Sequence, residues 1–362
     1  MKPDRLYPLS HSPVYFHFRQ TPADFTVSEI PLYDFSGEGE HLVLKVRKKG
    51  LTTWQMLQTL SSHLGIRVRD FGYAGLKDKD AMTIQYISLH KKYEERLKDF
   101  SHPQIKILER TLHANKLRIG HLKGNRFFIR LKKVNPTDAK KIDSLLEWIR
   151  LNGSPNYFGY QRFGREGDNF ETAKEIIEGK RKMRDRKRRD FLISAYQSHL
   201  FNLWLSKRIE ISRLFDALTE KELKELYVWN SALIKEIRRE HHFFRLLPGD
   251  VASHYPHGKH FVVDSVAEES DRFKNRQISP TGLLCGKKAK HSTGLAWEIE
   301  KEFIHDIPAQ GSRRYAWIWP EDVEGLYKEQ DAHYELHFTL PKGSYATVVL
   351  EMIANRPIRE GE

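Results

Sequence analysis

The order in which strand-like and helix-like patterns follow one another is the feature that most restricts the fold of this 362-residue chain. Residues 41–47, 84–90 and 127–131 are typical of β-strands, and the first of these alternates as a strand does. Residues 191–209 have the apolar spacing of a helix instead. Strand character returns at 333–340, the clearest alternation of apolar and polar residues in the sequence. The sequence therefore predicts an α/β domain interrupted by a helix-rich insertion.

Capping signals mark where helices begin and end. Thr52 or Thr53 opens a helix that Gly65 closes. A later helix is broken at residues 152–155, where Asn, Gly, Ser and Pro follow one another, and we take this break as a domain edge. Near the C-terminus, Ser344 is expected to cap a last helix. The apolar residues of the first helix recur at helical spacing, and they are Trp54, Leu57, Leu60 and Leu64.

Composition restricts the class of protein and its partners. A formal net charge of +13 and a pI near 9.5 favour a nucleic-acid partner, because phosphate contacts dominate nucleic-acid affinity. The single cysteine, Cys285, rules out an internal disulfide and fits a reducing cytoplasm. The N-terminus lacks the apolar run of a signal peptide, and no segment has the roughly 20 apolar residues of a membrane span. We therefore expect a cytoplasmic protein of two domains that does not enter a membrane.

One loop combines a tight turn with closely spaced charges. Residues 73–81 read Tyr-Ala-Gly-Leu-Lys-Asp-Lys-Asp-Ala, which places Asp78 between Lys77 and Lys79. Neighbouring cations favour the ionised form of a carboxylate, the form that a nucleophile requires at neutral pH. A solvated surface turn has the same pattern. The loop is a candidate active site, but taken alone it does not separate these two interpretations.

Several other short motifs accompany this loop in a fixed order. They read Pro-Ala-Asp-Phe-Thr-Val-Ser-Glu at 22–29, Lys-Gly-Asn-Arg-Phe at 123–127, Asn-Tyr-Phe-Gly-Tyr-Gln-Arg-Phe-Gly at 156–164 and Leu-Pro-Lys-Gly-Ser-Tyr-Ala-Thr at 340–347. Together with the loop at 73–81, they resemble the TruD-type tRNA pseudouridine synthases, and the resemblance runs nearly end to end. Enzymes of this family isomerise uridine 13 in the D arm of certain tRNAs. The resemblance implies the same isomerase activity here, with tRNA as the partner.

The resemblance also implies an architecture of the α/β (α+β) class. A pseudouridine synthase catalytic domain with a central, mostly antiparallel sheet comprises residues 1–155 and 307–362. A helix-rich α/β insertion, the TRUD domain, comprises residues 156–306. This arrangement agrees with the change of periodicity along the chain. Because the family does not depend on an obligate partner, we expect a monomer.

The resemblance assigns roles to residues around the loop. Asp78 matches the catalytic nucleophile, which attacks either C6 of the base or C1′ of the ribose. Phe25, Asn125, Phe127 and Tyr345 match positions that line the uridine pocket, although Tyr345 replaces the phenylalanine usual in bacterial relatives. Phe127 is the expected stacking partner, because an extruded base needs an aromatic face. The Asn125 amide can pair with the Watson–Crick edge of uracil, since each offers one donor and one acceptor.

Cations are expected to hold the charged groups of the site and of the substrate. Lys77 and Arg19 could each keep Asp78 ionised or grip a neighbouring phosphate, and Arg19 stands where the family often has a lysine. The basic run at 180–189 precedes a helix of the insertion, and we expect it to face the tRNA backbone, although a solvated face has the same composition. Its residues expected to contact RNA are Arg181, Lys182, Arg186, Lys187 and Arg188.

The expected chemistry needs no cofactor. Pseudouridine formation breaks the bond from C1′ of ribose to N1 of uracil, rotates the base and rejoins it through C5, without redox or phosphoryl transfer. The 18 histidines show no His-Glu-x-x-His or paired Cys/His spacing, so we also expect no metal site. Two alternatives stay open. One is a non-catalytic tRNA-binding or RNA-chaperone module, and the other is a nuclease in which Asp78 and Asp80 bind magnesium.

Overall fold

A computed structural model of the chain describes residues 5–77, 79–164, 166–227 and 229–358. These residues form two compact units, each assembled from segments that are far apart in sequence. The sheet unit comprises Val14–Glu147 and Pro320–Gly343. The helical unit comprises residues 5–13, Trp148–Trp319 and Ser344–Pro357.

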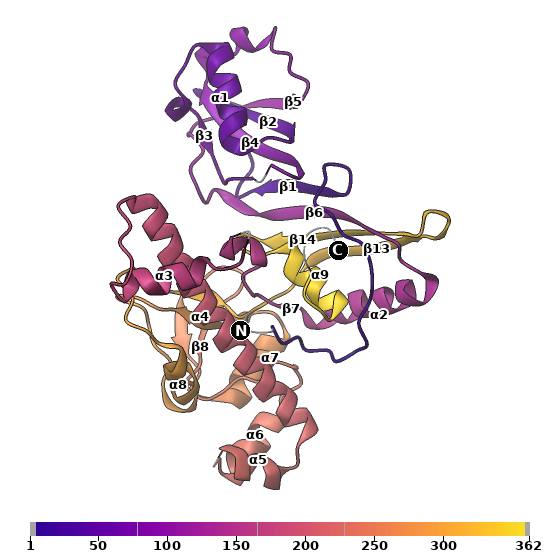
Figure 1. The fold of residues 1–362 in the computed structure, drawn as a ribbon, viewed down its shortest axis with the longest axis vertical. Helices are drawn as coiled ribbons and strands as arrows, with labels where there is room; N and C mark the ends of the chain where they lie inside the picture. The colour runs from indigo at the N-terminus through magenta and orange to yellow at the C-terminus, as the bar shows by residue number, and fades with distance from the viewer. Residues whose placement is uncertain (1–4, 78, 165, 228, 359–362) are drawn as a thin grey trace. The chain divides into compact units, whose positions relative to one another are not determined.

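The sheet unit contains the four predicted strands, which are β2, β4, β6 and β14, together with four strands that were not predicted, and helix α1 (Thr53–Leu64) packs on the sheet (Figure 1). Helix α2 (Pro136–Asn152) begins in this unit and ends in the helical unit. The strands of the sheet unit are β1 (Phe25–Pro31), β2 (His41–Lys49), β3 (Gly72–Tyr73), β4 (Met82–His90), β5 (Ile105–His113), β6 (Leu122–Lys132), β13 (Glu321–Lys328) and β14 (His333–Pro341).

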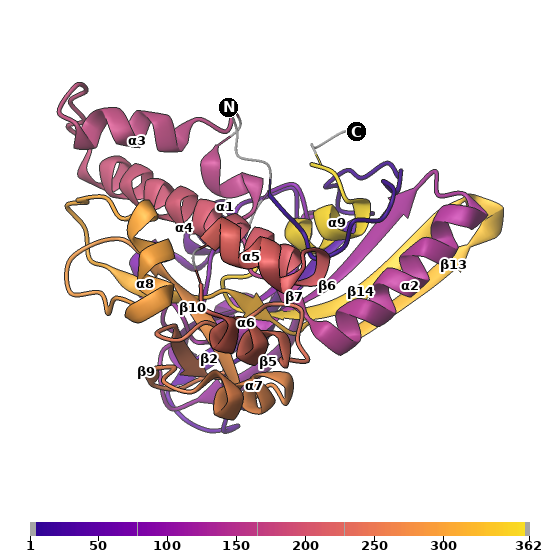
Figure 2. The same ribbon diagram turned by 90° about the horizontal axis from the view of Figure 1, so that it is seen from below.

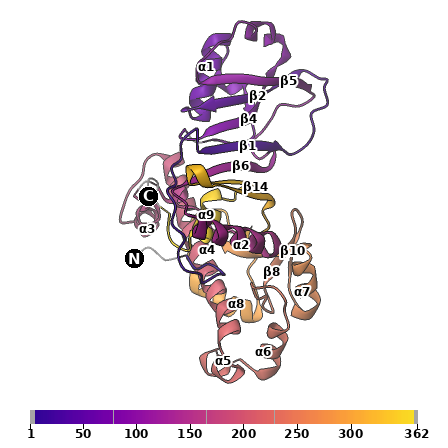
Figure 3. The same cartoon turned by 90° about the vertical axis from the view of Figure 1, so that its right-hand side faces the viewer.

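These strands form one sheet in the order β13-β14-β6-β1-β4-β2-β5, with the short β3 paired to β4 (Figure 3). Every strand pairing in it is antiparallel except that of β1 with β4. The expectation of a central, mostly antiparallel sheet is confirmed. The alternation at 41–47 and at 333–340 corresponds to β2 and β14, whose apolar residues are buried in the core.

Local signals set the ends of α1. The Thr52 hydroxyl accepts a hydrogen bond from the Gln55 N–H at 3.1 Å, and the Gln55 side chain accepts one from the Thr52 N–H at 2.8 Å. Thr52 is thus the cap, in a capping box. Gly65 ends the helix with φ +66°, a conformation that side chains disfavour. The spacing predicts Trp54 on the apolar face, but Trp54 is 52% exposed and Met56 packs in the core instead.

The helical unit is organised around α4, the longest helix among the described residues. Figure 2 shows α3 beside α4, and apolar side chains of both pack into one cluster with those of β10. Strands β11, β10, β8 and β9 form a sheet in that order, and β12 pairs with β7. The elements of this unit are β7 (Ser154–Pro155), α3 (Asn169–Ile177), α4 (Arg186–Ala217), α5 (Glu220–Tyr227), α6 (Ser231–Arg238), β8 (Val251–His254), β9 (His260–Val262), α7 (Val266–Lys274), β10 (Ile278–Leu284), α8 (Gly294–Glu300), β11 (Ser312–Tyr315), β12 (Trp317–Ile318) and α9 (Ala346–Ala354).

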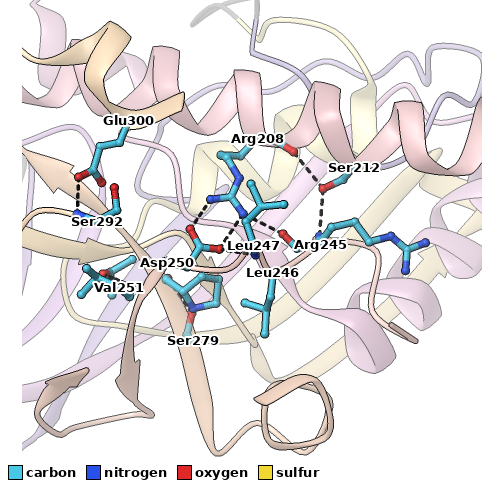
Figure 4. A network of polar contacts seen from close by, with 12 residues as sticks. Arg208, Ser212, Arg245, Leu246, Leu247, Asp250, Val251, Ser279, Ser292 and Glu300 are labelled. Atoms are coloured by element: carbon cyan, nitrogen blue, oxygen red, sulfur yellow. Dashed lines mark hydrogen bonds and ion pairs between the residues drawn. The ribbon is translucent and has the colours of Figure 1, made fainter. Parts of the chain in front are cut away.

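A buried ion pair fixes the interior of the helical unit (Figure 4). Arg208 on α4 donates to the two carboxylate oxygens of Asp250 at 2.5 and 2.9 Å, and both side chains are almost fully buried. The same guanidinium also donates to the Arg245 carbonyl at 2.8 Å. The two charges are therefore paired and hydrogen-bonded, which buried charges require. The pair ties α4 to the segment that leads into β8.

The domain boundaries at 155/156 and 306/307 stay a prediction. The compact units group residues 148–155, 307–319 and 344–357 with the insertion. A compact unit is defined by the contacts within it, whereas an inserted domain is defined by its place in the sequence. The two can differ, since an inserted segment can pack tightly against the ends of the domain that carries it. Within the part of the chain that the structure describes, no helix has both the length and the apolarity to cross a membrane.

Candidate active site

The sheet changes its pairing where β1 and β4 part. β1 runs parallel to β4 only through residues 26–28, and β3 takes its place farther along β4 at residues 87–88. Between these pairings, the Tyr86 N–H donates to Glu29 Oε2 at 2.9 Å. The carboxylate thus replaces a missing strand partner, since a backbone N–H shielded from water needs an acceptor. The candidate loop connects β3 to β4 and therefore starts and ends at this sheet.

Lys77 is held through both its side chain and its backbone. Its ammonium lies 2.9 Å from Glu29 Oε1, and the two side chains are 9% and 1% exposed. Its N–H donates to Thr53 Oγ1 at 2.8 Å, and its carbonyl accepts the Thr53 N–H at 3.3 Å. Thr53, the first residue of α1, in turn donates to Gln85 Oε1 on β4 at 2.9 Å. Asp78 lies outside the described residues, but the residue before it is anchored to β1 and α1.

Three residues predicted to line the uridine pocket share one face of the sheet with Glu29. β6 pairs with β1 so that Asn125 lies opposite Glu29 and Phe127 opposite Val27. Since alternate residues of a strand point to the same face, Phe25, Asn125 and Phe127 lie on the side of Glu29. The Asn125 Oδ1 is buried and accepts no hydrogen bond from a described residue. A buried acceptor without a partner can receive a donor such as the N3–H of uracil.

Phe25 and Phe127 belong to a row of packed rings. Their ring centroids lie 6.1 Å apart, and that of Phe127 lies 5.6 Å from Phe338 on β14. Phe127 is 6% exposed. Most of its ring therefore contributes to the core, and only a narrow part is open to a base. Stacking of the target uridine on Phe127 stays a prediction.

The cations and the second carboxylate around the loop differ in their surroundings. The ammonium of Lys77 faces Glu29, whose Oε1 accepts no well-aligned hydrogen bond, so the attraction is chiefly Coulombic. Arg19 is exposed three residues before the turn that leads into β1, and Lys79 and Asp80 are exposed after Lys77. Substrate contacts of Lys77 and Arg19 stay predictions. Among the residues that the structure describes, no group of three or more His, Cys, Asp or Glu side chains is placed to hold a metal ion.

Tyr345 belongs to the helical unit, where it is the N-cap residue of α9. The prediction that Ser344 caps this helix is wrong, because the Ser344 hydroxyl donates to Asn156 Oδ1 at 2.9 Å instead. The half-buried Tyr345 ring lies 6.1 Å from the ring of Phe158, which also faces the Arg314 guanidinium at 4.0 Å. Burial lowers the pKa of Arg314 to about 10. Contact of Tyr345 with the substrate stays a prediction.

The basic run occupies most of the α3–α4 connection and the first turn of α4. All five residues expected to contact RNA are exposed. Asp185 is the N-cap of α4, and its carboxylate accepts the Arg188 N–H at 3.0 Å. The first helical turn contains no acidic residue, although the helix dipole favours acidic residues at this end. The cations therefore oppose the local preference of the helix and concentrate positive charge on its exposed start.

No role at the site was predicted for Glu29, Thr53 or Gln85, although Thr53 was one of two candidate caps of the first helix. Glu29 carried a usable signal, because it stands two residues after Val27 and so on the apolar face of β1, where a carboxylate needs a partner. Thr53 and Gln85 carried none, since their hydrogen bond exists only once α1 has docked on β4.

Comparisons with known proteins show what the whole chain is similar to. A family model described as tRNA pseudouridine synthase D (TruD) matches residues 4–186 and 225–353. The chain is 60% identical to the tRNA pseudouridine synthase D of a Nitratiruptor species and 56% identical to that of Sulfurimonas denitrificans, over 98% of this chain and 99% of each relative. The crystal structure of a putative tRNA pseudouridine synthase D from Methanosarcina mazei matches with a TM-score of 0.70 and 22% identity, over 97% of this chain and 96% of that one. This last match confirms the predicted fold.

Proposed function

Because the chain belongs to the tRNA pseudouridine synthase D family, we propose that it converts uridine 13 in the D arm of tRNA to pseudouridine, with Asp78 as the nucleophile. The observation that carries this proposal is the anchored loop. The residue before Asp78 is bound through its side chain to Glu29 and through its backbone to Thr53. A fixed neighbour limits where the nucleophile can lie, and such positioning is a large part of catalysis.

The proposed reaction changes the atom through which uracil is attached to ribose. The C1′–N1 bond breaks, the base turns, and C1′ bonds to C5, while the C5 hydrogen leaves as a proton and N1 gains a proton. Substrate and product have the same atoms, so no oxidant, reductant or cosubstrate is consumed. Asp78 forms a bond to C6 or C1′ and is released at the end, as a covalent catalyst. In this proposal neither a metal nor an organic cofactor takes part.

The target uridine must leave the RNA stack before it reacts, because its reacting atoms are inaccessible inside it. We assign its Watson–Crick edge to Asn125, whose buried Oδ1 accepts the N3–H while the amide nitrogen donates to a uracil carbonyl. Phe127 and Phe25, on the same face, support the plane of the base. Tyr345 and Arg19 are assigned to the substrate on the family resemblance alone.

We assign the tRNA backbone to the exposed basic run at 180–189. A phosphate at the start of α4 would offset the repulsion among its cations and complement the helix dipole. This assignment agrees with the net charge of +13. The protein acts as a monomer in the cytoplasm in this proposal.

The test is tritium release from tRNA transcripts labelled at C5 of uridine, in excess chelator. The native protein should release tritium, and a transcript with cytidine at position 13 should give none. Asp78→Asn should bind the same tRNA without release. Asp80→Asn is the matched control, because it removes an exposed carboxylate two residues away, and it should keep most of the activity. Tight binding without release from any tRNA would contradict the proposal and favour a non-catalytic tRNA-binding protein.

A further inference from the structure

The sheet unit contains an open pocket that the proposed reaction does not use. Its volume is about 460 Å³, and it lies between the segment that follows β1 and the loop that follows β5. Every residue of the lining has a polar or charged group, and the lining includes two cations, one carboxylate, two imidazoles and a phenol ring, which can hold a ligand by hydrogen bonds, charge and stacking. These residues are Lys116, Arg118, Asp34, His113, His121 and Tyr33.

Contacts outside the pocket hold its walls in place. Leu117 is buried, and its N–H donates to Ser88 Oγ at 2.9 Å. A Cβ added at Gly72 would lie 2.4 Å from the Leu117 carbonyl oxygen, so the close approach of β3 to this loop requires glycine. The Lys116 ammonium donates to the Arg69 carbonyl at 2.9 Å, which leaves two of its protons for a ligand. The pocket is therefore largely formed before a ligand binds.

The Tyr33 ring is oriented by two histidines. It stacks on the His113 ring with centroids 5.1 Å apart and planes 25° apart. Its hydroxyl lies 2.8 Å from His121 Nδ1. The Ser36 N–H donates to His113 Nδ1 at 3.3 Å, so the proton of the neutral His113 ring is on Nε2. His113 is thus a hydrogen-bond donor as well as a support for the phenol ring.

The pocket is joined to the candidate active site by short connections. The Gly120 N–H donates to the Ala74 carbonyl at 2.8 Å, which links the pocket loop to the loop that follows β3. β6 begins directly after His121, so His121 and Asn125 are about 13 Å apart along an extended chain. Lys342 also donates to the Gly120 carbonyl, at 3.4 Å, and adds an exposed cation nearby. One RNA chain can therefore reach both Asn125 and the pocket.

We propose that this pocket binds a ribonucleotide of the tRNA that flanks the target uridine. Lys116 and Arg118 hold its phosphate, its base stacks on Tyr33, and Asp34 accepts a hydrogen bond from the ribose 2′-hydroxyl. Asp34 makes this pocket a poor site for a free anion such as inorganic phosphate, because its carboxylate repels the anion. The same carboxylate can accept a hydrogen bond from a hydroxyl group. The inference rests on the proposed function, since it concerns the same RNA substrate.

The first experiment measures tRNA binding by fluorescence anisotropy at several salt concentrations, in the Asp78→Asn background so that no turnover occurs. The double variant Lys116→Ala/Arg118→Ala should bind more weakly and should reduce the slope of log affinity against log salt by about one to two. The matched control is Lys98→Ala/Lys106→Ala, which removes two exposed lysines of the same unit outside the pocket and should leave the slope unchanged.

Two further variants separate the ring and the carboxylate from general charge. Tyr33→Ala should weaken binding roughly five- to hundredfold, the range for loss of one stacked base, whereas Tyr33→Phe keeps the ring and should bind almost normally. Thermal unfolding checks that each variant folds. Asp34→Ala should lower the ratio of the affinity for an RNA stem-loop to the affinity for DNA of the same sequence. In the catalytically competent protein, the Lys116→Ala/Arg118→Ala pair should raise KM and leave kcat unchanged, because the pocket touches no reacting atom.

The outcomes distinguish this inference from the proposed function. The proposed nucleotide site would be overturned if the Lys116→Ala/Arg118→Ala variant kept the native KM and salt slope, or if the control variant lost as much affinity for tRNA. Neither result would affect the tritium release by which the synthase activity is tested. A native protein that binds tRNA but releases no tritium would overturn the proposed function. In that case the anisotropy measurements would still decide whether the pocket holds a nucleotide.

Discussion

The ion pair between Glu29 and Lys77 can be tested by removing its charges singly and together. Glu29→Gln keeps an oxygen that accepts the Tyr86 N–H but removes the counter-charge of Lys77. The ammonium then has no counter-charge among the residues that the structure describes, in a place almost closed to water, and we expect the free energy of unfolding to fall by about 3–5 kcal/mol. Lys77→Met should cost a similar amount, because it leaves the carboxylate without its cation. The double variant Glu29→Gln/Lys77→Met removes both charges and should cost less than either single change.

Urea unfolding of the native protein and these three variants gives the double-mutant cycle. Exchange of the Tyr86 amide hydrogen reports on the same place locally, and it should become faster in both single variants. Lys45→Met is a matched control, because it breaks the 2.7 Å pair with Glu109, whose side chain is largely exposed, and should cost less than about 1 kcal/mol. Single-variant costs as small as this control would refute the argument, since the Glu29–Lys77 pair would then behave as a surface pair.

Three further predictions concern the helical unit. Lys187→Glu places an acidic residue in the first turn of α4, so it should raise the free energy of unfolding in urea by about 0.3–1 kcal/mol. The same change should weaken tRNA binding measured by fluorescence anisotropy, and stronger binding would contradict the assignment of the basic run to the tRNA backbone. Burial lowers the pKa of His242 to about 4, against about 6.5 when unfolded. The neutral His242 ring therefore makes its full contribution to the free energy of unfolding above pH 6.5, and this contribution, up to about 3 kcal/mol, is lost as the pH falls towards 4. Thermal unfolding of the native protein and of His242→Gln between pH 4 and 7 measures this loss. Arg208→Lys cannot reproduce the two-pronged contact with Asp250, so it should cost about 1.5–3 kcal/mol in urea unfolding, and a cost near zero would show that charge alone suffices.

Periodicity predicted the elements of the fold better than it predicted their details. The alternation at 333–340 and the helical spacing after Thr52 are local properties, and β14 and α1 form at those places. Trp54 fits the same helical spacing but is exposed, because the position of the sheet decides which side of α1 is covered. Ser344 fits a capping pattern but bonds Asn156, which is distant in sequence. Competition from distant partners has no local signature.

The candidate site shows the same division. The charge pattern of the loop drew attention to Asp78 and Lys77, and the family motifs to Asn125 and Phe127. Register between β1 and β6 then brings the last two onto the face of Glu29. The importance of Glu29 depends on the place where β1 leaves β4, a property of strand pairing that no single segment of sequence contains.

The pairing of β6 with β14 has a consequence for how the protein is made. These neighbouring strands are about 200 residues apart in sequence, and the chain between them includes most of the helical unit. At a synthesis rate of about 5–20 residues per second, β6 waits about 10 to 40 s for its partner. During that time its edge carries unpaired backbone groups, and Phe127 lacks the ring of Phe338. The surface proposed to receive the uridine is thus completed only when nearly the whole chain has been translated. Until then, the unfinished polypeptide exposes an unpaired strand edge that can pair with other chains and aggregate, at the place where the finished protein has its proposed binding face.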